Sequence, residues 1–341
     1  MHPSDFHPDF RATPECVRRV MGMTFREGGS AEVLLWIAAN GLGSCPKDAM
    51  GDLYDAVEQT KTAIAKIATN PDAVYAPRSY GDLPIGRMYA ANSSQGMWDD
   101  ARSAIYRTVE GALDFDFENA HPTILMAICD RLGVGCPKLR EYFERREEIL
   151  AEVKSASGVD RAQAKQLFNR LTNLGSVEGW MSKMKAKARP PHADDFLIEM
   201  QYIAQQLSIR YDKLYDHIEK HPVRRKDSNP KAHMVSYILS HIENECLCAA
   251  VCYALDMGAT VYSLIYDGFI ASGIGKESLA AMSDAVFNDV GIRLNVKVKE
   301  FQTSIKVNMD ECRFVDDRRV AHYFVDAMKD RLRMTSQGMW S

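Results

Sequence analysis

Two carboxylates at alternate positions, Asp114 and Asp116, are the residues in this sequence whose spacing points most directly to chemistry. They lie in the segment GALDFDFENAHPTIL, and the alternation with apolar residues has the period of a β-strand with both carboxylates on one face. Because neighbouring carboxylates repel each other, a fold that keeps them together usually neutralises them with a hard divalent cation. A solvated edge strand is the alternative interpretation. After the strand, Pro122 is suited to the first position of a helix over residues 123–130.

A second acid, Asp267, lies far downstream in Tyr266-Asp267-Gly268, between two apolar runs within residues 259–272. Asp-Gly between such runs is a strong hairpin signal, so Asp267 is expected at the tip of a hairpin with buried arms. Alone, Asp267 would be interpreted as a turn former. Together with Asp116, it suggests one half of a carboxylate pair that binds two metal ions.

The length, composition and net charge of the chain restrict the classes of protein to which it could belong. It has 341 residues, 46% of them hydrophobic, enough for one large or two modest domains. The net charge of −4 argues against a general basic surface for nucleic acid, so such binding must come from local clusters. Eight cysteines without a C-x-x-C pair indicate neither a zinc ribbon nor a disulfide framework, and favour reduced thiols inside a cell.

No membrane partner is expected from the sequence. The N-terminus lacks the basic and apolar regions of a secretory signal, and no uncharged run is long enough to span a bilayer. The most apolar predicted helix, residues 235–255, carries Glu243 and Glu245 in its middle. We therefore expect a soluble, globular, intracellular protein.

The other elements are expected to be mainly helical, because their apolar residues recur at helical spacing. The predicted helices cover residues 16–23, 31–40, 46–69, 97–109, 139–154, 159–174, 193–220, 235–255, 276–288 and the tail 309–341, with a half-exposed strand over 292–301.

Basic residues cluster at three places. Arg78, Arg87, Arg102 and Arg107 precede the first acidic strand, and the planar guanidinium group suits phosphate. The basic loops 183–189 and 224–231 are either contacts to a phosphate backbone or ordinary solvated charges.

In chain order, these elements resemble the palm and fingers of template-dependent polymerases, most closely family A DNA polymerases and more distantly family B. Residues 116–125, DFENAHPTIL, look like motif A, with Asp116 as a metal ligand and His121 in the place of the residue that senses the sugar. Asp267 in Tyr266-Asp267-Gly268 resembles motif C without its final Glu, and Asp114 is the candidate to replace that acid.

The resemblance continues in the fingers and the lead-in. Arg161-x-x-x-Lys165 looks like the opening of motif B, although Asn169 and Asn173 fall where that motif has Phe and Tyr. Gly86-Arg87 and Asn92-Ser-Ser-Gln95 resemble segments that precede motif A, with Arg102 where an arginine is expected.

The resemblance implies an α+β fold, a right-hand polymerase with a small antiparallel β palm that carries the acidic site, surrounded by helical fingers and thumb. The predicted segments are an N-terminal helical region that is thumb-like or accessory (1–75), a first palm segment with motif A (76–135), helical fingers with motif B (136–232), a second palm segment with motif C (233–308) and a C-terminal helical tail (309–341).

The implied activity is DNA-directed DNA synthesis by a two-metal mechanism. Asp116 and Asp267, with Asp114, would bind two Mg²⁺ ions, with Mn²⁺ as the alternative, while Lys165 and Arg161 hold the triphosphate. The implied substrate contacts also include His121, Arg87, Arg102, Asn169, Asn173 and Tyr266. The partners would be a primer–template, nucleoside triphosphates and accessory replication proteins.

About 80 residues precede the arginine-bearing loop, fewer than the roughly 100–150 residues of a typical domain. This favours a compact enzyme without a proofreading domain, of the kind carried by viruses and mobile elements. Three alternatives stay open: a primase-like or RNA-synthesising enzyme with the same palm, a non-catalytic nucleic-acid-binding replication protein, and a helical metal-dependent phosphodiesterase.

Overall fold

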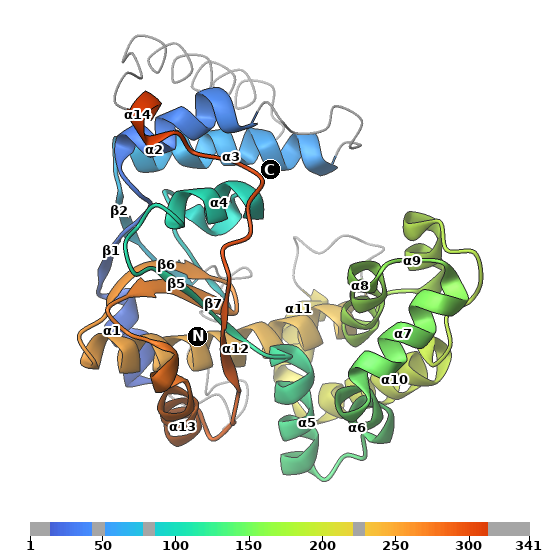
Figure 1. Cartoon of the computed structure of the whole chain (residues 1–341). Helices are drawn as coiled ribbons and strands as arrows, with labels where there is room; N and C mark the ends of the chain where they lie inside the picture. Colours follow the sequence, from blue (N-terminus) through green and yellow to red (C-terminus); the bar gives the residue numbers. More distant parts are fainter. Residues whose placement is uncertain (1–13, 43–51, 78–85, 221–228, 313–341) are drawn as a thin grey trace.

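The organising element of the fold is a four-stranded antiparallel sheet, in the order β6-β7-β5-β8 (Figure 1). The computed structural model describes residues 14–42, 52–77, 86–220 and 229–312. The acidic strand β5 lies in the middle of the sheet, between the second arm of the hairpin and β8. The strands are β5 (Leu113–Phe117), β6 (Thr260–Ile265), β7 (Gly268–Ser272) and β8 (Val296–Lys299).

The two faces of the sheet carry different side chains, because successive residues of a strand point to opposite sides. On one face, Phe115 and Phe269 stack with their ring centroids 5.0 Å apart in the larger core. On the other face, Ile270 packs into a second core. By the same alternation, the polar residues on this second face are Asp114, Asp116, Lys297 and Lys299.

Helices cover both faces and bury the apolar side chains (Figure 1). The first face packs against α1 (Glu15–Met21), α12 (Pro230–Asp256) and α13 (Leu279–Val290), and the second face lies toward α2 (Ala31–Trp36), α3 (Asp52–Thr69) and α4 (Asp99–Tyr106). Short helical turns lie at Ile37–Gly41, Ser94–Gly96, Lys276–Ser278 and, as α14, Met309–Cys312.

The long helix α12 contributes many of the buried side chains of the larger core. By length and composition it is the one helix in the described ranges that could cross a membrane, yet 72% of its most apolar window is buried within the fold. Burial on several sides is typical of a core helix. Glu243, in its middle, is only 1% exposed, so its negative charge needs an oppositely charged or hydrogen-bonding side chain within the fold.

A helical lobe follows β5 and lies to one side of the sheet (Figure 1). Its interior contains an aromatic cluster in which Tyr142 stacks on Phe168 at 4.3 Å and Phe196 meets both rings edge-on. The lobe consists of α5 (Ala120–Leu132), α6 (Pro137–Glu144), α7 (Arg146–Ser157), α8 (Arg161–Thr172), α9 (Val177–Met184), α10 (Ala193–Arg210) and α11 (Asp212–Lys220).

Three helix predictions are wrong in detail. The helix after β5 starts at Ala120, so Pro122 is its third residue; the first-turn N–H groups have no partner within a helix, so proline is tolerated there. The predicted helices 139–154 and 193–220 are each broken, at Arg145 and Tyr211, whose backbones leave the helical region.

Two short antiparallel pairs were not predicted, because segments of two or three residues show no periodicity. They are β1 (Thr24–Arg26) with β2 (Asp72–Val74), and β3 (Ala76–Pro77) with β4 (Met88–Tyr89). The predicted residues 46–51, the basic loop 224–228 and the tail beyond 312 lie outside the described residues, and the five predicted segments remain a prediction.

A buried carboxylate, Glu27, joins the N-terminal segment to the sheet. Its Oε2 accepts hydrogen bonds from the backbone N and the hydroxyl of Ser94, both at 2.9 Å, and Tyr75 donates to its other oxygen. The Ser94 hydroxyl oxygen also lies 2.9 Å from the hydroxyl oxygen of Ser263 on β6, within hydrogen-bond distance. Burial raises the pKa of Glu27 despite these hydrogen bonds, so this polar network belongs to the interior of the fold.

The hairpin has a different turn from the one expected. Its loop consists of Tyr266 and Asp267, and Tyr266 takes the left-handed conformation with φ of 49°. Gly268 is the first residue of β7, where a Cβ atom would lie 2.2 Å from the backbone oxygen of Phe115. Glycine is therefore required at this position by the close approach of β5, and not by the turn itself.

All the cysteines of the described residues are buried and free, and the prediction of reduced thiols stays a prediction.

Candidate functional site

The strand register brings Asp116 and Asp267 together. Asp116 pairs directly with Gly268 on β7, and the backbone N of Phe117 donates to the backbone oxygen of Asp267 at 3.1 Å. Asp116 is only 6% exposed. Burial, followed by the negative charges of Asp116 and Glu243, raises the pKa of Asp267 to about 6. Two carboxylates from distant segments therefore share one partly buried site.

Asp114 lies one pleat further along the same face of β5. The pKa of Asp114 is raised overall to about 6. Burial is the largest cause, the positive charges of Lys299 and Arg102 oppose it, and the negative charge of Asp116 adds to it. Nevertheless, no three His, Cys, Asp or Glu side chains in the described residues are close enough to bind one metal ion. The protein thus offers a pair of carboxylates, with a third acid nearby.

Two lysines on β8 face these acids, and neither belongs to the site predicted from the sequence. Nζ of Lys299 lies 2.7 Å from Oδ1 of Asp116, and Nζ of Lys297 lies 3.9 Å from Oδ2 of the same residue. Although burial lowers it, the pKa of Lys299 is raised overall by its contact with Asp116 and by the charges of Asp267 and Asp114. The only signal in the sequence was lysine at every second position of the strand.

His121 is held by a buried ion-pair cluster at the start of α5. Its Nε2 lies 3.0 Å from Oε1 of Glu243, and Arg87 donates from Nε to Oε2 of the same carboxylate at 2.7 Å. Burial opposes ionisation of Glu243, yet the hydrogen bond from His121 and the charge of Arg87 keep its pKa below the usual value. The guanidinium of Arg87 also lies 5.2 Å from the ring centroid of Tyr266, which precedes Asp267.

Two of the predicted substrate contacts, Arg87 and His121, therefore bind Glu243, a residue that the sequence marks only as a charge in an apolar helix. A carboxylate in an apolar run is a usable signal for such a cluster, because a buried charge requires a partner.

Arg161 and Lys165, the two predicted cations of α8, lie in different surroundings. Lys165 is exposed, and its pKa is lowered by desolvation and by the positive charges of Arg146 and Lys299, while Asp116 and Asp267 act in the opposite direction. It therefore lies within electrostatic range of the carboxylates. Arg161, at the first residue of α8, is exposed and donates from Nε to Glu147 on α7 at 2.8 Å.

The remaining predicted contacts lie at the borders of the site. Arg102 on α4 pairs with Asp99 and is close enough to lower the pKa of Asp114. Nδ2 of Asn173 donates to the backbone oxygen of exposed Asn169 at 2.9 Å, so these two residues contact each other at the end of α8.

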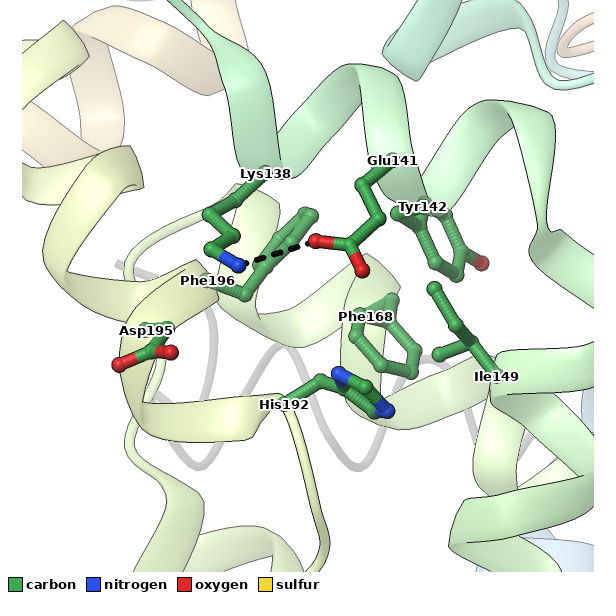
Figure 2. A pocket seen from close by; sticks show the side chains of 8 residues that line it. All are labelled: Lys138, Glu141, Tyr142, Ile149, Phe168, His192, Asp195 and Phe196. Atoms are coloured by element: carbon green, nitrogen blue, oxygen red, sulfur yellow. Dashed lines mark hydrogen bonds and ion pairs between the residues drawn. The ribbon is translucent and has the colours of Figure 1, made fainter.

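A small cavity in the helical lobe is a separate feature (Figure 2). It is lined by the aromatic rings of Tyr142, Phe168 and Phe196, and its volume of about 10 Å³ holds about one water molecule. Lys138 and Glu141 form an ion pair of 3.0 Å at its edge (Figure 2). It is too small for a nucleotide, and none of the predicted site residues lines it.

The chemistry of the donor set fits Mg²⁺. This ion typically binds through one or two carboxylates and completes its octahedron with waters and substrate phosphates. Asp116 and Asp267 would supply those carboxylates, and a cation between them would relieve the repulsion that raises the pKa of Asp267.

The raised pKa values predict a specific pH dependence of stability without metal. Asp114 and Asp267 retain protons in the folded protein up to about pH 6, whereas the unfolded chain releases them near its ordinary value of 3.8. The free energy of unfolding should therefore fall as the pH rises from about 4 to about 7, by about 3 kcal/mol for each of the two carboxyls. Glu243, with its lowered pKa, acts in the opposite direction below its ordinary value of 4.5.

Urea denaturation in EDTA between pH 4.5 and 7.5 measures this decline, and Asp267→Asn should remove some of it. A variant with the full wild-type decline would contradict the assignment of the raised pKa.

Comparisons with known proteins give similarities both in sequence and in structure. No protein family matches the chain. Over 231 residues the chain is 27% identical to a protein of Sputnik virophage, V13, which is named as a candidate helicase; the match covers 65% of this chain and spans only 29% of the length of that relative. Among solved structures, the chain is similar to the POL domain of Pol1 from M. smegmatis in complex with a DNA primer-template and dNTP. That similarity has a TM-score of 0.42 and 13% identity, and covers 72% of this chain and 50% of the other.

Proposed function

We propose that this chain catalyses template-directed nucleotidyl transfer, adding deoxynucleoside monophosphates to the 3′ end of a primer. The observation that carries the proposal is the strand register that pairs Asp116 with Gly268 and so brings Asp116 next to Asp267, with Lys165 of the helical lobe in electrostatic range. When bound, Mg²⁺ supplies electrostatic stabilisation to the attacking and leaving oxygens.

Each residue then has a physical role. Asp116 and Asp267 fix the position of the cation at the end of two strands, which is a rigid support for a reaction that depends on positioning. Desolvation, followed by the positive charges of Arg146 and Lys299, lowers the pKa of Lys165, and an incoming triphosphate would relieve the repulsion between these cations. His121, which lies in the first turn of α5 after the Asp116 strand and contacts Glu243, is proposed to contact the sugar.

Primer extension tests the proposal directly. A labelled primer–template is incubated with the protein, Mg²⁺ or Mn²⁺, and either dNTPs or NTPs. Templated addition of dNMPs is the expected result. Preference for NTPs would favour the RNA-synthesising alternative, and nucleic-acid binding without incorporation under any condition would favour the non-catalytic alternative.

The two cations of α8 should differ in their contribution. Lys165→Ala should reduce the single-turnover rate of incorporation by about 10²-fold, comparable to the loss of one electrostatic contact to a developing charge. Arg161→Ala should reduce it by no more than about threefold, because the Arg161 side chain is exposed and paired with Glu147. The opposite order of effects would assign the triphosphate to Arg161 instead.

A further inference from the structure

The strongest unassigned feature of the site is the contact of a lysine with a candidate metal ligand. β8 runs antiparallel to β5, and the direct cross-strand partners are Asp116 with Lys297 and Asp114 with Lys299. Nζ of Lys299 nevertheless reaches diagonally past its own partner, to 2.7 Å from Oδ1 of Asp116. The lysine therefore contacts one of the two acids that are proposed to bind the metal ion.

The ammonium group of Lys299 lies among all three acids of the site. Its Nζ lies 2.7 Å from Oδ1 of Asp116, an acid whose side chain is only 8% exposed. Lys297, at 3.9 Å from Asp116 and 3.7 Å from Glu118, adds a second positive charge at the edge of the site, and its longer distance makes its interaction with Asp116 weaker.

We propose that Lys299 is a resident counter-cation that competes with the divalent ion for Asp116, so that the site binds the ion weakly alone and strongly together with a nucleoside triphosphate. This inference rests on the proposed function, because it assumes that Asp116 and Asp267 bind the ion. A triphosphate offers the ammonium group another anionic partner, which frees Asp116. The side chain can move, since Lys299 is 49% exposed and lysine has a flexible stem.

The positive charge of Lys165, on α8 of the helical lobe, supports this exchange. Lys165 on α8 lies within electrostatic range of Lys299 and Arg146 as well as of Asp116 and Asp267. Without an anionic ligand, these cations repel each other and the divalent ion alike. With a triphosphate bound, the same charges become favourable contacts.

Titration with Mn²⁺, followed by electron paramagnetic resonance of the free ion, tests the inference without any measurement of activity. Lys299→Gln should tighten binding of Mn²⁺ alone by about fivefold to tenfold, since it removes both an ion pair and a like charge. Lys297→Gln should tighten it by about twofold, as expected from its longer distance. Lys306→Gln, an exposed lysine after β8, is the matched control and should have no effect.

The nucleotide dependence is the second arm. With a non-hydrolysable dNTP analogue present, wild type should gain more Mn²⁺ affinity than Lys299→Gln does. In an Asp116→Asn background, Lys299→Gln should tighten binding much less, because the contested ligand is gone and only the removal of a like charge remains. Lys299→Arg retains the charge and should behave like wild type, which separates the effect of charge from that of folding.

The failures are distinguishable. If wild type binds Mn²⁺ and incorporates nucleotides but Lys299→Gln has unchanged or weaker affinity for Mn²⁺ alone, the ion pair is structural and the inference is overturned while the proposed function stands. If no variant binds Mn²⁺ with or without nucleotide, and no incorporation occurs, the proposed function itself is overturned together with the inference.

Discussion

Asp116→Asn and Asp267→Asn are each expected to reduce the rate of templated incorporation by at least about 10³-fold, because each removes a charged ligand from a cation that stabilises the reacting phosphate. Asparagine retains the shape of aspartate, so the strand pairing between Asp116 and Gly268 should remain. The single-turnover rate with a saturating primer–template and dNTP is the appropriate measurement, because it separates chemistry from binding.

Stability separates loss of chemistry from loss of fold. Asp267→Asn removes one of two like charges at the site, and the pKa of Asp267 is raised from 3.8 to about 6 in the folded protein. At pH 8 without metal this variant should therefore be more stable than wild type, by about 1–3 kcal/mol. A protein that is more stable yet inactive cannot owe its inactivity to misfolding.

Two control variants complete the experiment. Asp256→Asn removes an exposed carboxylate that pairs with Arg19 at the end of α12, and should change neither the rate nor the stability by a measurable amount. Asp114→Asn should cause a loss smaller than about tenfold if it only supports the pair. Activity of Asp116→Asn or Asp267→Asn near the wild-type level would refute the two-carboxylate site.

The acidic strand and the hairpin could be predicted because their signals are local. Alternation at Asp114 and Asp116 and the apolar arms around Asp267 set strand structure over a few residues. The sequence also placed the three acids in one site, on the strength of resemblance and chain order. It misjudged the reason for Gly268, which is the proximity of Phe115 on a strand about 150 residues away in sequence.

The residues that were missed acquire their meaning only through tertiary contacts. Lys299 is an ordinary solvent-facing lysine by pattern, until the register of β8 with β5 brings its ammonium group to Asp116. Glu27 lies in a segment without recognisable chemistry, yet folding surrounds it with hydroxyl groups from three distant segments. Helical periodicity also placed Arg161 and Lys165 on one face, but could not predict that Glu147 pairs with the first of them.

Glu243 is the residue whose removal should affect stability most. Its side chain is 2% exposed and is the shared partner of Arg87, at 2.7 Å, and of His121, at 3.0 Å. Glu243→Ala leaves Arg87, itself only 27% exposed, without its carboxylate, and should cost about 3–5 kcal/mol of the free energy of unfolding. Urea denaturation measures this loss, and Glu147→Ala, which breaks the exposed pair with Arg161, is the matched control, with an expected cost below about 1 kcal/mol.

A double-mutant cycle with Arg87→Ala shows whether the loss comes from the ion pair. If it does, Arg87→Ala should add much less destabilisation to Glu243→Ala than to wild type, with a coupling energy of about 1–3 kcal/mol. Additive effects would instead assign the loss to the cavity left in α12.

The functional consequence of this cluster should appear in the choice of sugar. Glu243→Gln keeps an acceptor for Arg87 but removes the negative charge beside His121, so it should fold with a smaller loss of stability. If His121 contacts the sugar and Glu243 holds its ring in place, the ratio of kcat/KM for dNTP and NTP should change by about tenfold in this variant, while His121→Ala changes it at least as much. An unchanged ratio in both variants would mean that the cluster only stabilises the packing of α5 on α12, and that another residue distinguishes the sugars.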